Sequence, residues 1–345
     1  MTALILTTLI KLDSNENPFG PSPSAVKAMQ AVLADSSSYP DDEASTLRLK
    51  LAEHHGVTIE QVLVAGGLTE FLGMLARTFL ATGLNAVTSE RSFIVYRLAT
   101  QAANAQLIEV PVRRNGFDLP AIAAAVNRNT RLIFLANPNN PTGTLVTVDE
   151  VDHFLRQIPD HVVVVLDEAY YEFAADFAVR RSVKYSHSLD YVHEGRKVVV
   201  LRTFSKVHGL AGVRVGYGIA PAELTAVISR QRAMYCVSNL AQAAALAALE
   251  DPAHIRKAVE NNTGQAERLV PAMSELGYST TVTWANFLYC DLGQDAGNFA
   301  ARLQAEGIVV RALAQWGAPQ AIRITIGTPE QNDALLMVLR KLKRG

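Results

Sequence analysis

The stretch that decides the fold reads RTFSKVHGLAGVRVG, from Arg202 to Gly216, and it directly follows the apolar run Val198–Leu201. A continuous β-branched run of this kind predicts a strand buried on both faces, as in a parallel sheet. Lys206 then lies just past the strand end, among small and hydroxyl residues. Desolvation and a nearby cation such as Arg214 lower the pKa of a buried lysine, whose amine can then form a Schiff base. The alternative is an ordinary surface lysine that follows a strand.

A carboxylate ends a second buried run, Val162–Leu166, where the chain continues as Asp167-Glu168-Ala-Tyr170. Ligands of open α/β sheets bind at the carboxyl ends of the strands. A carboxylate in that place can keep a pyridine nitrogen protonated, so that the ring accepts electrons from a substrate carbanion. A metal-binding pair or a helix cap would also use these two acidic residues.

Two further segments suit a ligand at the same edge of the sheet. The prolines of Asn137–Gly143 fix a rigid loop after the run Leu132–Leu135, and such a loop can aim an Asn amide at a ligand oxygen or form a simple turn. Ala65–Glu70 joins a predicted strand to a predicted helix, so its free N–H groups and the helix dipole suit a phosphate. Glycine turns before helices also occur without any ligand. The eight histidines show no metal-ligand spacing, so we expect no metal site.

Helical and strand patterns alternate from about residue 45 to residue 201, which predicts an α/β fold with a mostly parallel sheet covered by helices. After Pro252 the pattern changes to a long helical stretch and short strands, which predicts a smaller α+β domain. The first thirty residues are too irregular for the sheet core and are expected to cross to that domain. We therefore expect an N-terminal arm and part of the small domain in 1–30, a large domain in 31–250 and a C-terminal small domain in 251–345. Beyond the strands already named, the predicted strands are 62–65, 107–110, 278–282, 287–291, 308–310 and 322–326, and the predicted helices are 47–55, 70–80, 252–276 and 298–306.

Composition narrows the class of protein. The 345 residues are 49% hydrophobic and 19% charged, which indicates a folded chain too long for a single hydrophobic core. A net charge of −1 without a dense basic run argues against a nucleic-acid partner. Two separate cysteines, Cys236 and Cys290, argue against a disulfide framework and favour the cytoplasm. The apolar stretch Thr2–Ile10 is too short to span a membrane and lacks a cleavage site, so we expect an arm or edge strand that packs on a partner surface.

These segments, in this order and with Arg214 eight residues after Lys206, resemble the fold type I aminotransferases that use pyridoxal 5'-phosphate (PLP). Within that superfamily the chain is similar to the histidinol-phosphate aminotransferase group. The motifs that carry this similarity are NENPFGPS at Asn15–Ser22, Tyr39-Pro-Asp41 and RITIGT at Arg323–Thr328, and the resemblance covers essentially the whole chain. It implies a large domain with a mostly parallel sheet flanked by helices, plus a smaller α+β domain.

The resemblance also implies how the cofactor is held. Lys206 would bind it covalently and move a proton between the substrate Cα and the cofactor. Asp167 would pair with the ring nitrogen, Tyr170 and Asn140 would hydrogen-bond the phenolic oxygen, and Phe93 would stack on the ring unless it is only a core aromatic. Tyr39 would reach the cofactor phosphate from a neighbouring subunit, so we expect a homodimer with shared active sites. The other phosphate contacts would come from Gly67, Leu68, Thr203, Ser205 and Arg214.

Two arginines would bind the substrate. Arg323 matches the arginine that grips the α-carboxylate as a bidentate fork. Arg311 matches the arginine that meets the phosphate of histidinol phosphate, although a structural salt bridge would explain it too. Asn15 and Phe19 complete the expected substrate-binding set. Phe19 stands where many members of the group carry tyrosine, so a hydroxyl that could contact the phosphate is absent.

The activity implied is transfer of an amino group from an amino donor, L-histidinol phosphate, to a 2-oxo acid acceptor, 2-oxoglutarate, in histidine biosynthesis. An aromatic amino acid aminotransferase acting on phenylalanine or tyrosine is the alternative within the family. A PLP decarboxylase of the threonine-phosphate type shares the same frame. A non-catalytic PLP-binding protein is the alternative from another class, and such regulators usually carry a DNA-binding segment for which this chain has no room.

Overall fold

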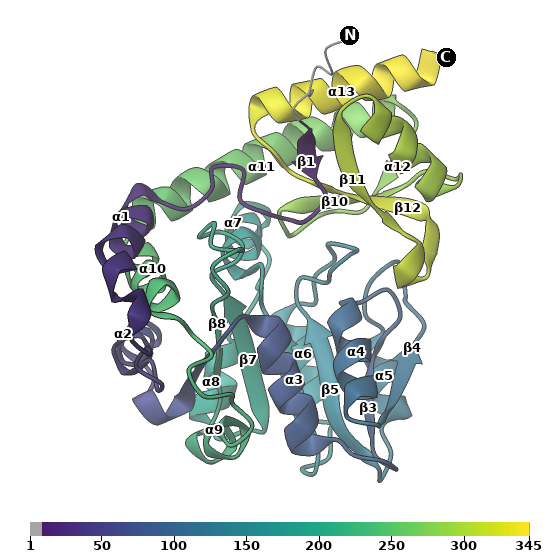
Figure 1. Cartoon of the computed structure of the whole chain (residues 1–345). Coiled ribbons are helices and arrows are strands. Elements are labelled where there is room, and N and C mark those ends of the chain that lie inside the picture. The colour runs from purple at the N-terminus through teal and green to yellow at the C-terminus, as the bar shows by residue number, and fades with distance from the viewer. Residues whose placement is uncertain (1–8, 345) are drawn as a thin grey trace.

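A seven-stranded sheet forms the centre of the larger part of the molecule in this computed structural model, which describes residues 9–344 (Figure 1). The stretch 2–8 of the predicted arm lies outside the described residues. The strands follow the order β2-β8-β7-β6-β5-β3-β4. Their bounds are β2 Val62–Ala65, β3 Asn85–Ser89, β4 Gln106–Val110, β5 Thr130–Ala136, β6 Val163–Asp167, β7 Val198–Thr203 and β8 Gly216–Ile219.

The sheet is mostly parallel, as predicted. Strands β7, β6, β5, β3 and β4 pair in parallel, while β8 runs antiparallel to both of its neighbours. The sequence patterns did not predict β8 or β3. Strand β8 reads Gly-Tyr-Gly-Ile, and a side chain on Gly218 would overlap the ring of Phe71, so the glycine that hides the strand pattern lets helix and sheet approach.

Alternate residues of the strands point into two separate apolar layers. In β6, for example, Val164 and Leu166 pack on one side, and Val163 and Val165 pack on the other. This burial on both faces is why the strand sequences are continuous apolar runs. The layer around Val164 packs against α2 Ser45–His55, α5 Leu119–Ala125, α6 Val148–Leu155, α8 Ser188–His193 and α10 Asn239–Leu249, and the other packs against α3 Leu68–Phe79, α4 Ile94–Ala102 and α9 Ala222–Ser229.

A second sheet of five strands lies above the first in Figure 1, in the order β1-β11-β12-β10-β9. Its strands are β1 Ile10–Leu12, β9 Ser279–Thr280, β10 Phe287–Asp291, β11 Ile308–Leu313 and β12 Ala318–Thr325. Strand β1 pairs in parallel with β11, so the start of the described chain joins strands that come some 300 residues later. The helices that pack with this sheet are α12 Ala296–Ala305, α13 Pro329–Arg344 and part of α11 Pro252–Glu275.

Helix α11 links the two parts as a long diagonal from the side of α1 and α10 to the small sheet (Figure 1). Helix α1 Pro23–Ala31 packs against α10, and α7 Tyr171–Arg181 packs against α11. Three short 3-10 helices complete the described elements, at Leu33–Ser37, Ile59–Gln61 and Ala314–Trp316. No helix among residues 9–344 combines the length and the apolar composition that a membrane span needs.

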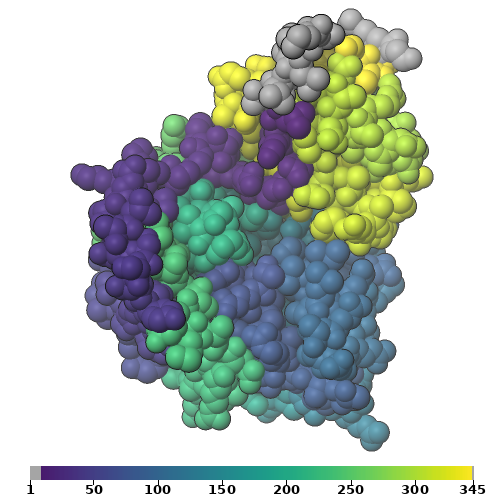
Figure 2. Space-filling view, viewed as in Figure 1, coloured from purple at the N-terminus to yellow at the C-terminus, as the bar shows by residue number. Residues whose placement is uncertain are grey.

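The N-terminal segment between β1 and α1 crosses the molecule from the small sheet to the large part, as the purple atoms of Figure 2 show. It passes so close to the loop after Lys206 that a side chain on Gly209 would overlap the carbonyl oxygen of Gly20. Gly209 has a φ of +71°, which also favours glycine. The crossing segment and the lysine loop are therefore packed directly on each other.

Candidate active site

A cavity of about 390 Å³ lies where the carboxyl ends of β5, β6 and β7 face the small sheet and the N-terminal segment. Ligands of open α/β sheets bind in this position. Most of the residues predicted from sequence line it: Asn15, Leu68, Phe93, Asn140, Asp167, Tyr170, Thr203, Ser205, Lys206, Arg214, Arg311 and Arg323. Segments that lie up to about 300 residues apart in the chain thus meet in one cavity.

Lys206 follows β7 and is half-buried in the cavity wall. Its Nζ donates a hydrogen bond of 3.2 Å to the carbonyl oxygen of Ser14, and it lies 5.7 Å from the centre of the Tyr170 ring. Burial, and next the charge of Arg323, lowers the pKa of Lys206 to about 8. A larger fraction of this amine is therefore unprotonated near neutral pH than for an exposed lysine, and only the unprotonated amine is a nucleophile.

Asp167 ends β6 and is buried, with 4% of its surface exposed. The hydroxyl of Tyr96 donates to its Oδ2 at 2.9 Å, and the backbone N–H of Ala169 donates to its Oδ1 at 3.2 Å. Burial raises the pKa of Asp167 to about 6, against the opposing effect of these hydrogen bonds. A cation brought into the cavity beside this carboxylate would stabilise its charged form.

Tyr170 and Asn140 lie between Asp167 and the small sheet. The Tyr170 hydroxyl accepts a 2.9 Å hydrogen bond from the amide of Asn15, and burial raises the pKa of Tyr170. Asn140 accepts a 2.5 Å hydrogen bond from Arg323. The crossing segment therefore contributes Asn15 directly to the network around the cavity.

Arg311 and Arg323 lie opposite each other on β11 and β12. Arg323 is buried and donates to the carbonyl oxygen of Asp13 at 2.8 Å, while its Nε has no hydrogen-bond partner in the described part of the chain. Arg311 is more exposed and forms an ion pair of 2.8 Å with the carboxylate of Asp13. Two guanidinium groups thus face the cavity from one side, which suits a ligand with two anionic groups.

The turn from β2 to α3 forms the opposite end of the cavity. Gly67 has a φ of +92° and leaves the first turn of α3 without a side-chain cap. A Cβ at Gly67 would overlap the guanidinium of Arg214, which lines the cavity and donates to the carbonyl oxygen of Ala211 at 2.8 Å. Uncapped helix N–H groups beside a guanidinium form a cradle for an anion such as a phosphate.

Three predicted residues do not line the cavity. Gly67 lies just behind it, against Arg214. Phe19 packs against the apolar cluster that contains Tyr170, and the Nζ of Lys257 lies 4.2 Å above its ring. Tyr39 is 80% exposed and stacks on Tyr235.

Sequence reasoning missed several residues of this site. Asp13 binds both arginines, Tyr96 binds Asp167, and Trp316 and Thr69 belong to the cavity lining. Tyr96 had a weak signal, because a tyrosine within an apolar helix face usually directs its hydroxyl to a polar partner. Asp13 had none, since its partners lie about 300 residues away in the chain.

Comparison with known proteins agrees with this geometry. Residues 7–339 match the family model described as aminotransferase class I and II. The chain is 43% identical to histidinol-phosphate aminotransferase 2 of Pseudomonas fluorescens strain Pf0-1, across 98% of this chain and 90% of that protein. It is 42% identical to histidinol-phosphate aminotransferase of Moorella thermoacetica, across 97% of this chain and 85% of that protein.

A solved structure is similar over nearly the same length. The crystal structure of histidinol-phosphate aminotransferase from Sinorhizobium meliloti in complex with pyridoxal-5'-phosphate superposes with a TM-score of 0.89 at 28% sequence identity. The match covers 97% of this chain and 90% of that one. This chain and that structure therefore share one fold over nearly their whole length.

Proposed function

The chain belongs to the class I and II aminotransferase family, and from that premise we propose that it transfers the amino group of L-histidinol phosphate to 2-oxoglutarate with PLP as cofactor. The products are imidazole acetol phosphate and L-glutamate, and the setting is histidine biosynthesis. One observation carries the proposal: a single cavity holds Lys206 and Asp167 on one side and two opposed arginines, Arg311 and Arg323, on the other.

The residues of the cavity fit PLP at both ends of that molecule. Bound PLP supplies an electron-accepting ring that stabilises negative charge on the substrate Cα. Asp167, a buried carboxylate with a raised pKa, would pair with the protonated ring nitrogen. The uncapped N–H groups at the start of α3, next to Gly67, and the guanidinium of Arg214 would hold the phosphate. The other expected phosphate ligands, Leu68, Thr203 and Ser205, line the same cavity.

Lys206 would hold the cofactor covalently and then move protons. Its lowered pKa leaves the free amine available for attachment. Once displaced by the incoming amino group, the same amine would take the proton from the substrate Cα and deliver it to the cofactor. Tyr170 and Asn140 would hydrogen-bond the cofactor oxygen, and Phe93 would cover the ring face.

Each of the two arginines would bind an anionic group of one of the two substrates. Arg323 would bind the carboxylate of 2-oxoglutarate or glutamate, using the Nε that has no partner among the described residues. Arg311 would bind the substrate phosphate with the donors that its ion pair to Asp13 leaves free. Asn15 would fix the position of Tyr170 beside the substrate. Phe19 would support Tyr170 through the apolar cluster, and it brings no hydroxyl to the phosphate.

We further propose that the enzyme is a homodimer in which Tyr39 completes the active site of the partner subunit. The side chain is 80% exposed and does not line the cavity of its own subunit, which suits a role in another copy. Leu33 and Met234 are also exposed apolar residues, at 59% and 72%, in the segments next to Tyr39 and its stacking partner Tyr235. Contact with a second subunit would bury them.

We also propose that the chain divides into an N-terminal arm with part of the small domain (1–30), a large domain (31–250) and a C-terminal small domain (251–345). The two sheets support it, because the strands of the large sheet fall within 62–219 and those of the small sheet within 10–12 and 279–325. A cytoplasmic setting rests on the use of cysteine: Cys236 and Cys290 are both free thiols.

A second candidate, an aromatic amino acid aminotransferase, has one observation in its favour. Phe93 and Trp316 both line the cavity and would pack against an aromatic substrate side chain. Arg311 already has a carboxylate partner in Asp13, so a neutral substrate would not leave it unpaired.

A half-reaction tests the proposal. The enzyme loaded with PLP is mixed with L-histidinol phosphate without any acceptor, and the cofactor absorbance is followed. We expect the aldehyde form to be converted to the pyridoxamine form in one turnover and to return when 2-oxoglutarate is added. Release of carbon dioxide from an amino acid donor without this reversible cycle would instead identify a decarboxylase.

A further inference from the structure

Tyr39 lies on an exposed strap, which we define as residues 38–43, between the 3-10 helix at 33–37 and helix α2. The strap contains no helix or strand of its own. Its tyrosine is nevertheless stacked on Tyr235, with 4.4 Å between ring centres and 22° between ring planes. An exposed side chain on an irregular segment needs anchors if it is to keep one position.

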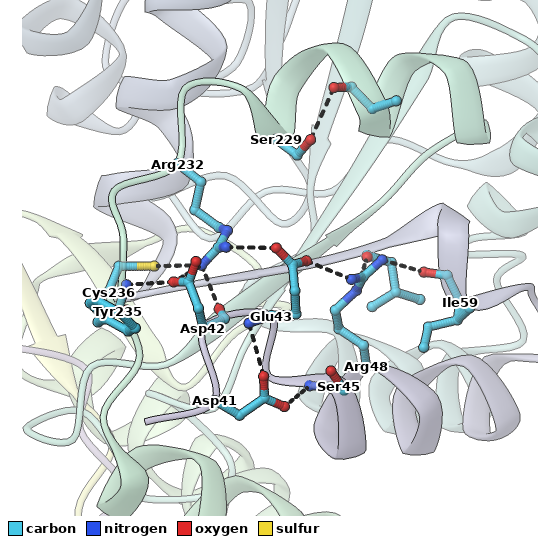
Figure 3. A network of polar contacts seen from close by, with 12 residues as sticks. Asp41, Asp42, Glu43, Ser45, Arg48, Ile59, Ser229, Arg232, Tyr235 and Cys236 are labelled. Carbon is cyan, nitrogen blue, oxygen red and sulfur yellow. Dashed lines mark hydrogen bonds and ion pairs between the residues drawn. The ribbon is translucent and has the colours of Figure 1, made fainter. Parts of the chain in front are cut away.

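Arg232 provides the central anchor, as Figure 3 shows. Its guanidinium donates to the carbonyl oxygen of Asp42 at 2.6 Å and to the carboxylate of Asp42 at 3.1 Å. It also donates to the carboxylate of Glu43 at 3.0 Å. The Arg232 side chain is only 9% exposed, while the side chains of Asp42 and Glu43 are 32% and 58% exposed, so the contact with Asp42 is the better shielded from water.

Asp42 connects this anchor to the stacking partner of Tyr39. Its Oδ1 accepts a 2.5 Å hydrogen bond from the backbone N–H of Tyr235, a residue with a φ of +56°. The hydrogen bond from Tyr235 and the guanidinium of Arg232 lower the pKa of Asp42, so the carboxylate stays charged at neutral pH. Arg232 and Asp42 thus hold the backbone of Tyr235 and the strap at the same time.

The segment that carries Arg232 also touches the cofactor end of its own cavity. The carbonyl oxygen of Cys236 lies 3.0 Å from the position that a Cβ of Gly66 would take, and Cys236 Sγ lies 3.8 Å from Arg232. Gly66 precedes the anion cradle at Gly67. The segment 232–236 therefore packs against the turn proposed to bind the phosphate in its own subunit, and it also holds Tyr39 in place.

We propose that Arg232 is a positioning residue for cofactor binding in the partner subunit: it clasps the strap so that the Tyr39 hydroxyl is presented to the phosphate held by the second copy. This inference rests on the proposed function, because it needs both the cofactor and the dimer. A lysine could not replace the arginine, since one ammonium cannot reach the two carboxylates and the carbonyl with the planar fork that the contacts use.

The first test is cofactor affinity, measured by titrating the apoenzyme with PLP and following its absorbance. Arg232→Gln should weaken binding roughly tenfold, as expected when one hydrogen bond to a charged group is lost. Tyr39→Phe should weaken it by a similar factor. In the Tyr39→Phe background, Arg232→Gln should cause almost no further loss, because the hydroxyl that it positions is already gone.

One control and one milder variant belong to the same titration. Arg268→Gln removes an arginine with matched partners in the small part of the molecule, namely the carboxylate of Asp333, the amide oxygen of Gln265 and the carbonyl of Pro329, and it should leave PLP affinity unchanged. Asp42→Asn disturbs the clasp more gently and should give a smaller loss in the same direction as Arg232→Gln.

Mixed dimers provide the second test. In a dimer of an Arg232→Gln subunit and a Lys206→Ala subunit, the intact lysine site receives Tyr39 from a subunit with a normal clasp, so it should bind PLP with wild-type affinity. The second mixed dimer joins a wild-type subunit to a subunit with both Lys206→Ala and Arg232→Gln. Its only Lys206 site receives Tyr39 from the subunit that lacks Arg232, so this site should show the full loss of PLP affinity.

The outcomes distinguish a failure of the proposed shared site from a failure of the role proposed for Arg232. If wild type binds no PLP, or if Tyr39→Phe leaves affinity unchanged, the proposed shared site is wrong and this inference with it. If Tyr39→Phe weakens PLP binding but Arg232→Gln does not, only the positioning role proposed for Arg232 is wrong. Equal losses from Arg232→Gln in the wild-type and Tyr39→Phe backgrounds, or a loss in the first mixed dimer and none in the second, would show a role within its own subunit and overturn the positioning role.

Discussion

Lys206 combines features that a surface lysine lacks. It lies at the end of a buried strand, near Arg323 and above the ring of Tyr170. Its Nζ donates to a carbonyl oxygen, and within residues 9–344 it forms no ion pair with a carboxylate, although the charges of Glu16 and Asp167 partly oppose the lowering of its pKa. The residue is therefore prepared for attachment of a carbonyl compound before the cofactor arrives.

The rate of cofactor attachment should follow the pKa of this lysine. The unprotonated amine is the reactive form, so the rate constant for PLP capture by the apoenzyme should rise between pH 7 and 9 and level off above the pKa of about 8. Stopped-flow absorbance over this pH range measures it. A rate that still rises tenfold per pH unit at pH 9.5 would show that Lys206 keeps the pKa of an exposed lysine.

Replacement of Arg311 and replacement of Arg323 should impair the reactions of different substrates. Arg311→Ala should cost about 2 kcal/mol in kcat/KM for a phosphorylated substrate, roughly thirtyfold, and much less for phenylalanine. Arg323→Ala should weaken the amino acid and the 2-oxo acid partners alike, because both carry the carboxylate that it binds. The role assigned to Arg311 would be wrong if phenylalanine suffered as much as the phosphate ester.

At the scale of elements, a buried ion pair joins the ends of the two strands that carry the site. Glu168, next to Asp167 after β6, accepts from Arg202 of β7 at 2.9 and 3.2 Å, and the two side chains are only 2% and 8% exposed. The Arg202 guanidinium also lies 3.5 Å from the centre of the Tyr171 ring. The pair holds the strand ends in register just below Asp167 and Lys206.

Breaking this pair should destabilise the protein strongly. Glu168→Gln leaves the Arg202 charge buried without its partner, which costs about 3 kcal/mol or more. Glu194→Gln removes an exposed pair with Arg196 and should cost less than about 1 kcal/mol. Thermal unfolding of both variants under one set of conditions compares them, and equal melting temperatures would contradict the structural role of the buried pair.

The crossing segment can be tested with a pair of glycines that share one backbone conformation. Gly209 and Gly195 both have a φ of +71°, but only Gly209 faces a neighbour, the carbonyl oxygen of Gly20. Gly195→Ala should cost about 1 kcal/mol from backbone strain alone. Gly209→Ala should cost more and also weaken PLP binding, because it pushes the segment that carries Asn15 away from Lys206. If the two variants have the same PLP affinity, the segment does not depend on this close contact.

The sequence predicted these elements where burial leaves a clear pattern. Strands β5, β6 and β7 are continuous apolar runs because helices cover both faces of the sheet, and each was predicted to within two residues at either end. Strand β8 was missed because its glycines make room for Phe71. Strand β3 was missed because Asn85, Thr88 and Ser89 are polar residues buried through hydrogen bonds to other strands and loops.

The residues of the candidate site could likewise be predicted only where they follow a clear strand pattern. Lys206, Asp167, Asn140 and the glycine turn were predicted because each follows its own strand, and parallel strands bring their ends together. Asp13 could not be predicted, since its binding to Arg311 and Arg323 depends on how the N-terminal segment crosses between the two sheets. Local sequence carries no signal for such a path.

At the scale of the whole molecule, the cavity depends on three parts of the chain. The large sheet supplies the residues proposed to bind the cofactor, the small sheet supplies the two arginines, and the crossing segment supplies Asn15 and Asp13. The groups proposed to bind the substrate thus lie on a different sheet from those proposed to bind PLP. Substrate choice can therefore change in the small sheet while the cofactor site stays the same.

The most direct measurement of the central claim is kcat/KM for L-histidinol phosphate and for L-phenylalanine, with 2-oxoglutarate as acceptor and one enzyme preparation. We predict a ratio that strongly favours histidinol phosphate and that falls when Arg311 is replaced by alanine. A ratio that favours phenylalanine would contradict the proposed substrate and would assign the enzyme to aromatic amino acid metabolism.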